Sequence, residues 1–213
     1  EAPVTALAAQ GQAVAAALAN GKVTIRGGPH DGLVLDAAGG RPLGCVTALA
    51  FDGPHALLIA VGSETHPLER WKHDLMQLGR SGSVWRADLT TGALSPLARK
   101  LGFPFGVLAV EGGALVAESW RHRLLMLRDG RPPEPVLSDL PAYPARLARA
   151  SGGGAWLAMF APRRQLTEFI LREPAYRDAM MAEVEPDLWV APALKSNVSF
   201  FEPMQGGALK QMG

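Results

Sequence analysis

The sequence predicts an all-β fold, a β-propeller of the six-bladed type with helical insertions, and three observations support it. A short apolar strand, a turn at glycine and a second apolar strand recur four times within the 213 residues. Each of the first three pairs is followed by another candidate hairpin, which gives four strands per unit. The units recur about every 40 to 60 residues, a spacing typical of propeller blades.

The first unit spans residues 4–42. Its two opening strands meet at Gly11, and the turn at Asn20-Gly21 leads into the second hairpin. The alternative interpretation of residues 6–18 is an Ala-rich helix. Glycine disfavours a helix interior, so Gly11 and Gly21 weigh against that alternative.

The second and third units span residues 46–101 and 105–140, and a fourth begins at Ala145. Their first strand pairs turn at Gly53 and Gly112, as the first pair does at its own glycine. A closed ring typically needs four to eight blades. We therefore expect residues 1–213 to form one propeller domain that is incomplete, covering about three and a half blades.

The segment 66–78 interrupts the second unit and predicts a helix. Pro67 suits its first turn, and Gly79 suits its C-terminal stop. The apolar residues of one predicted face are Leu68, Trp71, Leu75 and Leu78. We expect this helix to lie at one end of the propeller and to cover it in part.

The segment 164–184 predicts two short helices, divided at Pro174, at the same end of the propeller. Their apolar stripes indicate core packing; the alternative is an adaptable substrate lid around Met180-Met181. The apolar residues concerned are Leu166, Phe169, Ile170, Tyr176, Met180 and Val184.

Composition narrows the function classes. The chain has 48% hydrophobic residues and a formal net charge of +1, from 21 Lys+Arg against 20 Asp+Glu. This globular, balanced composition argues against a nucleic-acid partner, which needs a concentrated basic face. No apolar run approaches the roughly 20 residues of a membrane span. The single cysteine, Cys45, excludes an internal disulfide and a Cys-based zinc site, and its apolar surroundings indicate a buried thiol. No signal peptide is visible, yet the chain begins at Glu1 rather than Met, so the localisation stays open, cytoplasmic or periplasmic.

Several motifs together resemble the strictosidine synthase-like family. They are residues 82–88 (GSVWRAD), 91–92 (TG), 103–107 (FPFGV), 116–119 (VAES), 140–144 (LPAYP) and 153–158 (GGAWLA). The resemblance implies a six-bladed propeller, related more distantly to gluconolactonases and paraoxonases. Those relatives bind a divalent metal, often calcium, in the central channel and hydrolyse lactones or esters. The plant synthases instead condense an amine with an aldehyde without metal, using a glutamate for which this sequence offers no matching position.

The sequence departs from the metal-binding relatives where they carry ligands. Phe105 stands in place of an asparagine ligand, and Ala145-Arg146 follows Pro144 where an aspartate is usual. Calcium needs six to eight oxygen ligands, and a guanidinium repels it. We therefore expect no metal and no cofactor. We expect Arg146 to point into the channel, where it pairs with Glu118 or Glu64 or holds an anionic ligand.

Three residues are candidates for catalysis. Glu118 ends a strand of the third unit and could act as a base in the channel; the alternative is a structural salt bridge with Arg121 or Arg123. Glu64 and His66 follow the equivalent strand of the second unit and could share acid–base work if they converge. Their alternative is helix capping in a surface loop.

The candidate ligand contacts are Arg146, Phe105, His122 and Phe160. No G-x-S-x-G elbow is present, and the histidines do not have metal-ligand spacing. Two functions follow as expectations. One is a strictosidine synthase-like propeller that handles a small organic molecule in its channel, as an ester or lactone hydrolase that needs no calcium. The other is a non-catalytic propeller that binds an anionic small ligand or a protein partner, whose identity the sequence leaves unknown.

Overall fold

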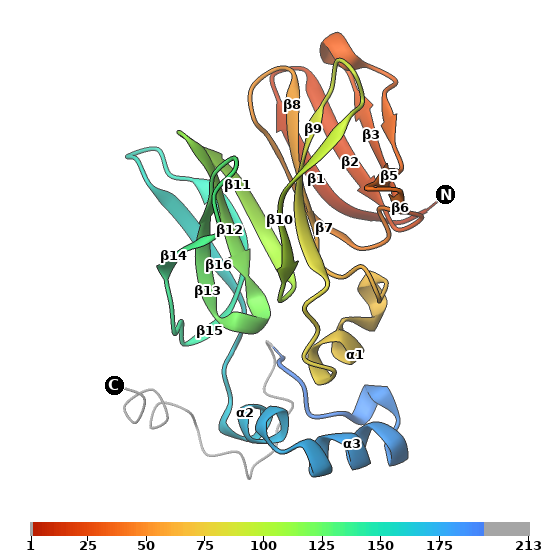
Figure 1. Ribbon diagram of the computed structural model, residues 1–213, viewed down its shortest axis with the longest axis vertical. Helices are drawn as coiled ribbons and strands as arrows, with labels where there is room; N and C mark the ends of the chain where they lie inside the picture. Colours follow the sequence, from red (N-terminus) through yellow and green to blue (C-terminus); the bar gives the residue numbers. More distant parts are fainter. Residues whose placement is uncertain (1, 194–213) are drawn as a thin grey trace.

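The computed structural model describes residues 2–193, which form three four-stranded antiparallel sheets, two β-hairpins and short helices (Figure 1). The first sheet contains β1 (Val4–Gln10), β2 (Ala13–Leu18), β3 (Lys22–Arg26) and β4 (Val34–Leu35). The second contains β7 (Val46–Phe51), β8 (Ala56–Val61), β9 (Gly82–Asp88) and β10 (Leu94–Leu101). The third contains β11 (Pro104–Val110), β12 (Gly113–Glu118), β13 (Arg123–Leu127) and β14 (Glu134–Leu137).

The remaining strands form two hairpins, β5 (Ala37–Ala38) with β6 (Arg41–Pro42), and β15 (Ala142–Arg149) with β16 (Ala155–Pro162). Short 3-10 helices are η1 (Gly28–His30), η2 (Leu68–Arg70), η3 (Ser119–Arg121) and η4 (Pro186–Leu188). The α-helices are α1 (Trp71–Met76), α2 (Gln165–Arg172) and α3 (Pro174–Glu183). The fold is all-β and propeller-like, as the sequence predicts.

The Ala-rich segment over residues 6–18 is a pair of strands, which confirms the strand prediction against the helical alternative. Ala15 and Ala17 are fully buried, whereas Val14, between Ala13 and Ala15, is exposed. Burial at alternate positions is the period of a strand. Gly11 has a φ of 57°, a conformation that favours glycine and closes the turn between the two strands.

Successive sheets pack face to face, and alternate residues of β8 contribute to two different core layers. Leu57 and Ile59 belong to the layer shared with the first sheet. Leu58 and Ala60 belong to the layer shared with the third sheet. A strand buried on both faces needs apolar residues at every position. This explains the continuous ALLIAV sequence of β8.

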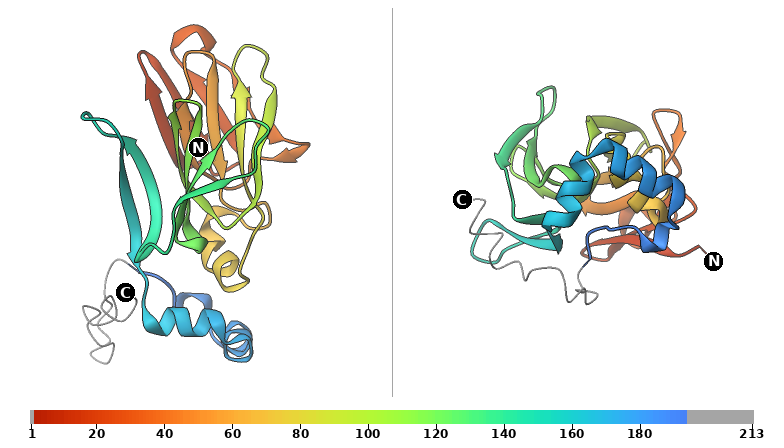
Figure 2. Two further views of the ribbon diagram at one scale, coloured as in Figure 1. Left: turned by 60° about the vertical axis from the view of Figure 1, so that its left-hand side comes forward. Right: turned by 90° about the horizontal axis from the view of Figure 1, so that it is seen from below.

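All three α-helices lie at one end of the sheets, as Figures 1 and 2 show, which confirms the predicted placement of the insertions. The boundaries of the first helix differ from the prediction. It starts one residue after Pro67, in η2, and ends at Met76. Because α1 ends this early, Leu78 lies beyond the apolar face and is 47% exposed.

Gly79 follows the end of this helix closely, but the chain reverses one residue before it. Leu78 has the positive φ, 54°, that reverses the chain there, whereas Gly79 does not. Glycine is required at position 79 for a different reason. A Cβ atom there would overlap the Asp74 carboxylate, which packs directly against the backbone.

The division of the second insertion at Pro174 is confirmed, since α2 ends at Arg172 and α3 begins at Pro174. Ile170 is fully buried and Met180 is 8% exposed, as core packing requires. The expectation of core packing is wrong for the other four predicted apolar positions, which are exposed: Leu166, Phe169, Tyr176 and Val184. Helices α2 and α3 are short and pack against the end of the propeller on one face only. Each therefore buries few of its side chains. Among residues 2–193, no helix is long and apolar enough to cross a membrane.

Candidate functional site

A channel runs between the first strands of the four units, β1, β7, β11 and β15. Two adjoining cavities of about 360 and 590 Å³ lie along it, each lined by residues of all four strands. In the second, third and fourth units the first strand begins, and its antiparallel partner ends, toward the helices (Figure 1). The connections that follow β8, β12 and β16 therefore meet at this helical end of the channel. All seven sequence-predicted site residues come from these connections or from strand segments near this end.

Gly106 sets the spacing between β11 and β15. A Cβ atom at this position would overlap the carbonyl oxygen of Ala145 and touch the backbone of Arg146. Gly106 is buried and its φ is not positive, so it is required for this close approach rather than for a turn. The glycine thus allows β15 to present Arg146 toward the channel.

Arg146 reaches across the channel, as predicted. Its Nη1 donates to the Thr47 carbonyl oxygen of β7, and its Nη2 lies 3.5 Å from the Thr5 carbonyl oxygen of β1. Its guanidinium carbon lies 5.1 Å from the centre of the Phe105 ring of β11, a cation–π distance. Arg146 of β15 therefore contacts the three other channel strands.

The expectation that Arg146 pairs with Glu118 or Glu64 is wrong, because both carboxylates bind other arginines. No carboxylate of residues 2–193 lies within ion-pair distance of Arg146. Desolvation lowers the pKa of the Arg146 guanidinium, yet an arginine remains charged at neutral pH. The side chain also stays accessible from the channel. Its charge is therefore available to an anion.

Aromatic rings fill the helical end next to Arg146. Phe105 and Phe160 meet edge to face at 5.9 Å, and Phe160 meets Trp71 of α1 at 5.4 Å. Trp71 lies 6.3 Å from Trp120, which stacks on Phe103 at 4.4 Å. The structure thus brings three of the four predicted ligand contacts, Arg146, Phe105 and Phe160, together beside an apolar wall.

Glu118 is completely buried in a structural ion pair with Arg123, one of the two partners considered from the sequence. One carboxylate oxygen lies 2.5 Å from Arg123 Nε, and the other accepts the Gly102 backbone N–H at 2.7 Å. Both oxygens are therefore occupied. Among the residues lining the two channel cavities, Glu118 does not occur.

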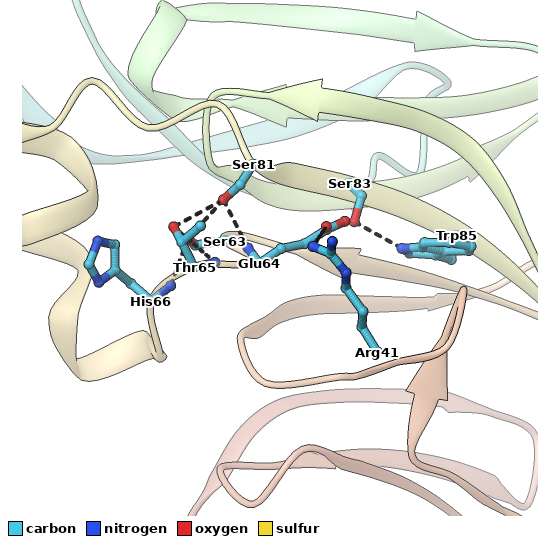
Figure 3. A network of polar contacts seen from close by, with 8 residues as sticks. All are labelled: Arg41, Ser63, Glu64, Thr65, His66, Ser81, Ser83 and Trp85. Carbon is cyan, nitrogen blue, oxygen red and sulfur yellow. Dashed lines mark hydrogen bonds and ion pairs between the residues drawn. The ribbon is translucent and has the colours of Figure 1, made fainter.

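Glu64 and His66 diverge (Figure 3). Glu64 is exposed and lies 3.2 Å from Arg41 Nη1, whereas the His66 ring lies 2.7 Å from Gln77 Oε1. The geometry matches the surface-loop alternative better than shared acid–base work.

Ser63, beside these two residues, organises the connection between β8 and α1. Its hydroxyl accepts the backbone N–H groups of Thr65 and His66 at 3.2 and 3.1 Å, and donates to Asp74 Oδ2 at 2.7 Å. Ser81 adds a hydroxyl contact at 3.1 Å and accepts the N–H of Glu64 (Figure 3). The network is built from backbone and hydroxyl groups and fixes the start of the helical insertion.

Asp74 fastens α1 to two neighbouring sheets. Its side chain is 1% exposed, accepts the Ser63 hydroxyl from the end of β8, and accepts the Trp120 indole N–H at 2.8 Å from the end of β12. Cys45 is a buried free thiol nearby, as predicted, and burial raises its pKa to about 11. Neither the aspartate nor Trp120 was proposed from the sequence as a positioning residue, since their partners lie far apart along the chain.

His122, the fourth predicted ligand contact, lies apart from Arg146 in a cluster under α2. Its ring meets the fully buried Tyr143 at 4.5 Å, and its Nε2 lies 3.8 Å from Glu168 Oε1. The Tyr143 hydroxyl donates to Glu168 at 3.0 Å, and Arg163 binds the other oxygen of Glu168 at 2.9 Å. The cluster joins η3, β15 and α2, so it positions the helix.

We expect this cluster to weaken as the pH falls through about 6.5 to 4. Burial is the main cause that lowers the pKa of His122 to about 4, below its unfolded value near 6.5. In this pH window the unfolded chain binds a proton at His122 that the folded protein does not bind. The free energy of unfolding therefore falls as the pH drops through the window. Between pH 7 and 4.5, the wild type should lose about 2 kcal/mol more unfolding free energy than His122→Asn.

Asparagine is the matched replacement for His122 because it tolerates the φ of 49° at this position. Urea unfolding at a series of pH values measures the difference between the two proteins. Parallel pH profiles for wild type and variant would contradict the assignment of the effect to His122.

A calcium ion does not fit the residues present. The metal-binding relatives of the family that the sequence resembles carry metal ligands at the positions of Phe105, Ala145 and Arg146. None of these three residues offers a side-chain oxygen. Within the described residues there is no group of three or more His, Cys, Asp and Glu side chains that could hold a metal ion.

No family model matches the sequence, and no curated protein matches it. Several solved structures of other proteins do match this structure. A protein to which gluconolactonase activity has been ascribed aligns with TM-score 0.51 and 17% identity over 70% of this chain and 54% of its own. A streptogramin B lyase aligns with TM-score 0.52 and 12% identity over 74% and 48%. A catalytically inactive virginiamycin B lyase from Staphylococcus aureus, determined with quinupristin, aligns with TM-score 0.50 and 12% identity over 75% and 50%.

These structures are β-propellers, and the successive sheets around a channel place this protein in the same class. The chain spans about half the length of each of the three. Identities this low show the fold alone.

Proposed function

We propose that this protein is a strictosidine synthase-like propeller that binds a small organic anion at the helical end of its channel. The observation that carries the proposal is Arg146, a cation that lies in the channel without a carboxylate partner among the described residues. Phe105 lies under the guanidinium, and Phe160 packs against Phe105, so this charge stands beside aromatic rings. A concave site with one charged group among apolar side chains is the usual form of a small-ligand pocket.

Hydrolysis of a lactone or ester is the second candidate, since one structural neighbour is ascribed gluconolactonase activity. The three residues predicted to be catalytic do not support it in their present contacts. Glu118 is held by Arg123, Glu64 lies beside Arg41, and His66 bonds Gln77. Binding without turnover is therefore the function that the geometry favours.

Replacing the cation should abolish most of the binding. Octanoate serves as the probe, because it is a small organic anion with an apolar chain. We expect Arg146→Gln to weaken octanoate binding by at least about tenfold, because hydrogen bonds to charged groups contribute about 1.5–3 kcal/mol. Calorimetric titration of wild type and variant measures the change, and raising the salt concentration should lower the wild-type affinity.

Arg131→Gln is the matched control, since Arg131 is exposed between β13 and β14, away from the channel. It should bind octanoate as the wild type does. Equal affinities for wild type and Arg146→Gln would refute the proposal. Steady hydrolysis of a lactone by the wild type, lost in a Glu118, Glu64 or His66 variant that remains folded, would establish the hydrolase instead.

A further inference from the structure

Two histidines from different sheets meet at the end of the sheets opposite the helices. His30 belongs to η1, between β3 and β4, and His55 belongs to the turn between β7 and β8, which lies at that end because β7 begins toward the helices (Figure 1). His30 Nε2 and His55 Nδ1 lie 2.9 Å apart, and the rings meet edge to face with centroids 5.1 Å apart. The sequence analysis did not select this pair, because its members are 25 positions apart and form no motif.

Backbone contacts fix the two segments that carry the histidines. A Cβ atom at Gly27 would overlap a carbonyl oxygen of the turn between β1 and β2, so the loop before His30 packs directly on that turn. The Asp31 carboxylate accepts the Gly27 N–H at 2.7 Å and closes the loop around His30. The His55 carbonyl oxygen accepts the Leu89 N–H at 2.8 Å, which ties its turn to the end of β9. The fold itself therefore brings the two imidazoles together.

The pair is open to solvent, since His55 is exposed and His30 is half-buried. Among residues 2–193, neither ring lies within ion-pair distance of a carboxylate. The other contact between histidines differs, because the rings of His66 and His73 are 6.0 Å apart and His66 Nε2 is held by Gln77. An ion in solution can thus reach two imidazole nitrogens at His30 and His55.

The separation of the two nitrogens suits a metal ion. Metal–nitrogen bonds to imidazole are about 2.0–2.1 Å long, so two nitrogens bound at a right angle are roughly 2.9 Å apart. Without an ion, one ring donates a hydrogen bond to the other. When an ion binds, the donating ring carries its proton on its other nitrogen, and both rings turn their lone pairs toward the ion. Right-angled coordination by nitrogen and oxygen is typical of copper(II) and nickel(II), and copper(II) binds such sites most tightly.

We infer that His30 and His55 together bind one divalent transition-metal ion, copper(II) most tightly, with water at the remaining coordination positions. The protein supplies two ligands, and the described residues contain no group of three or more. The expectation that no metal binds rests on the channel residues, and neither histidine lines the channel cavities. Because the two ligands come from the first and second units, the ion would link these units.

Calorimetric titration with copper(II), in a buffer that does not bind metal, should show one ion bound per chain. His30→Asn and His55→Asn should each weaken this binding at least about tenfold, since each removes one of the two protein ligands. Electron paramagnetic resonance of the copper(II)-loaded wild type should show coupling to two imidazole nitrogens. His66→Asn is the matched control, because its ring lies outside the pair, and it should bind copper(II) as the wild type does.

Circular dichroism shows whether each variant is folded. Equal copper(II) affinity in the wild type and both pair variants would overturn the inference. So would a loss in only one of the two, because the site requires both rings. Octanoate titration keeps this inference separate from the proposed function. A protein that binds copper(II) through the pair but binds no octanoate would refute the proposed function alone.

Discussion

Gly106→Ala should lower the unfolding free energy by about 3 kcal/mol, because overpacking a closed contact costs about that much. The added Cβ would overlap the Ala145 carbonyl oxygen, and the obstructing atom belongs to backbone that has no alternative rotamer. For a chain of this size the loss corresponds to a fall in Tm of about 6–12 °C. Thermal unfolding followed by circular dichroism measures it.

The same substitution should also weaken octanoate binding, since β15 must move away from β11 and carry Arg146 with it. Gly44→Ala is the matched control. Gly44 has no positive φ, and a Cβ there would have no heavy atom within 4 Å. We expect that variant to keep the wild-type Tm and affinity. A Gly106→Ala protein as stable as the control would show that the two strands are not locked together at this point.

Glu118→Ala should destabilise the protein by about 3–5 kcal/mol, the usual cost of removing one partner from a buried ion pair. Arg123, whose side chain is 24% exposed, would lose its carboxylate, and the Gly102 N–H would lose its acceptor. Glu118→Gln should cost less than Glu118→Ala, because the amide oxygen can still accept the backbone N–H while only the charge is lost. Denaturation in urea at 25 °C measures both changes.

A double-mutant cycle with Arg123→Gln provides the control for this effect. Once Arg123 is neutral, Glu118→Gln should cost much less than it does in the wild type, since the two residues interact directly. The remaining folded Glu118→Gln protein should still bind octanoate. Additive losses would show that Glu118 and Arg123 do not interact in stabilising the fold, and ligand binding lost at unchanged stability would show that Glu118 acts in the channel.

The fold could be predicted from the sequence because its signals are local. Gly11 and Gly112 have positive φ values at hairpin turns, and strand alternation is visible within each segment. The helix boundaries near Leu78 were less predictable. Both Leu78 and Gly79 follow the apolar face, and only the packing of Asp74 against the backbone decides which residue takes the left-handed conformation.

The candidate site was predictable only in part. Phe105 and Arg146 were identified because they differ from a known motif, and the structure brings them together. The partners of Glu118 and Glu64 depend on which arginine the fold brings nearest, and sequence distance does not determine this.

The hydrogen bonds of Asp74 have a consequence for how fast a ligand exchanges. The Ser63 hydroxyl and the Trp120 indole hold α1 to two sheets, so opening at α1 would break both bonds and expose a buried carboxylate. Helices α2 and α3 leave Phe169 and Tyr176 largely in water, and they are joined to the sheets through the Glu168 cluster. We expect amide protons of α2 and α3 to exchange with solvent faster than those of α1, and ligand entry and release at the helical end to be timed by that pair of helices.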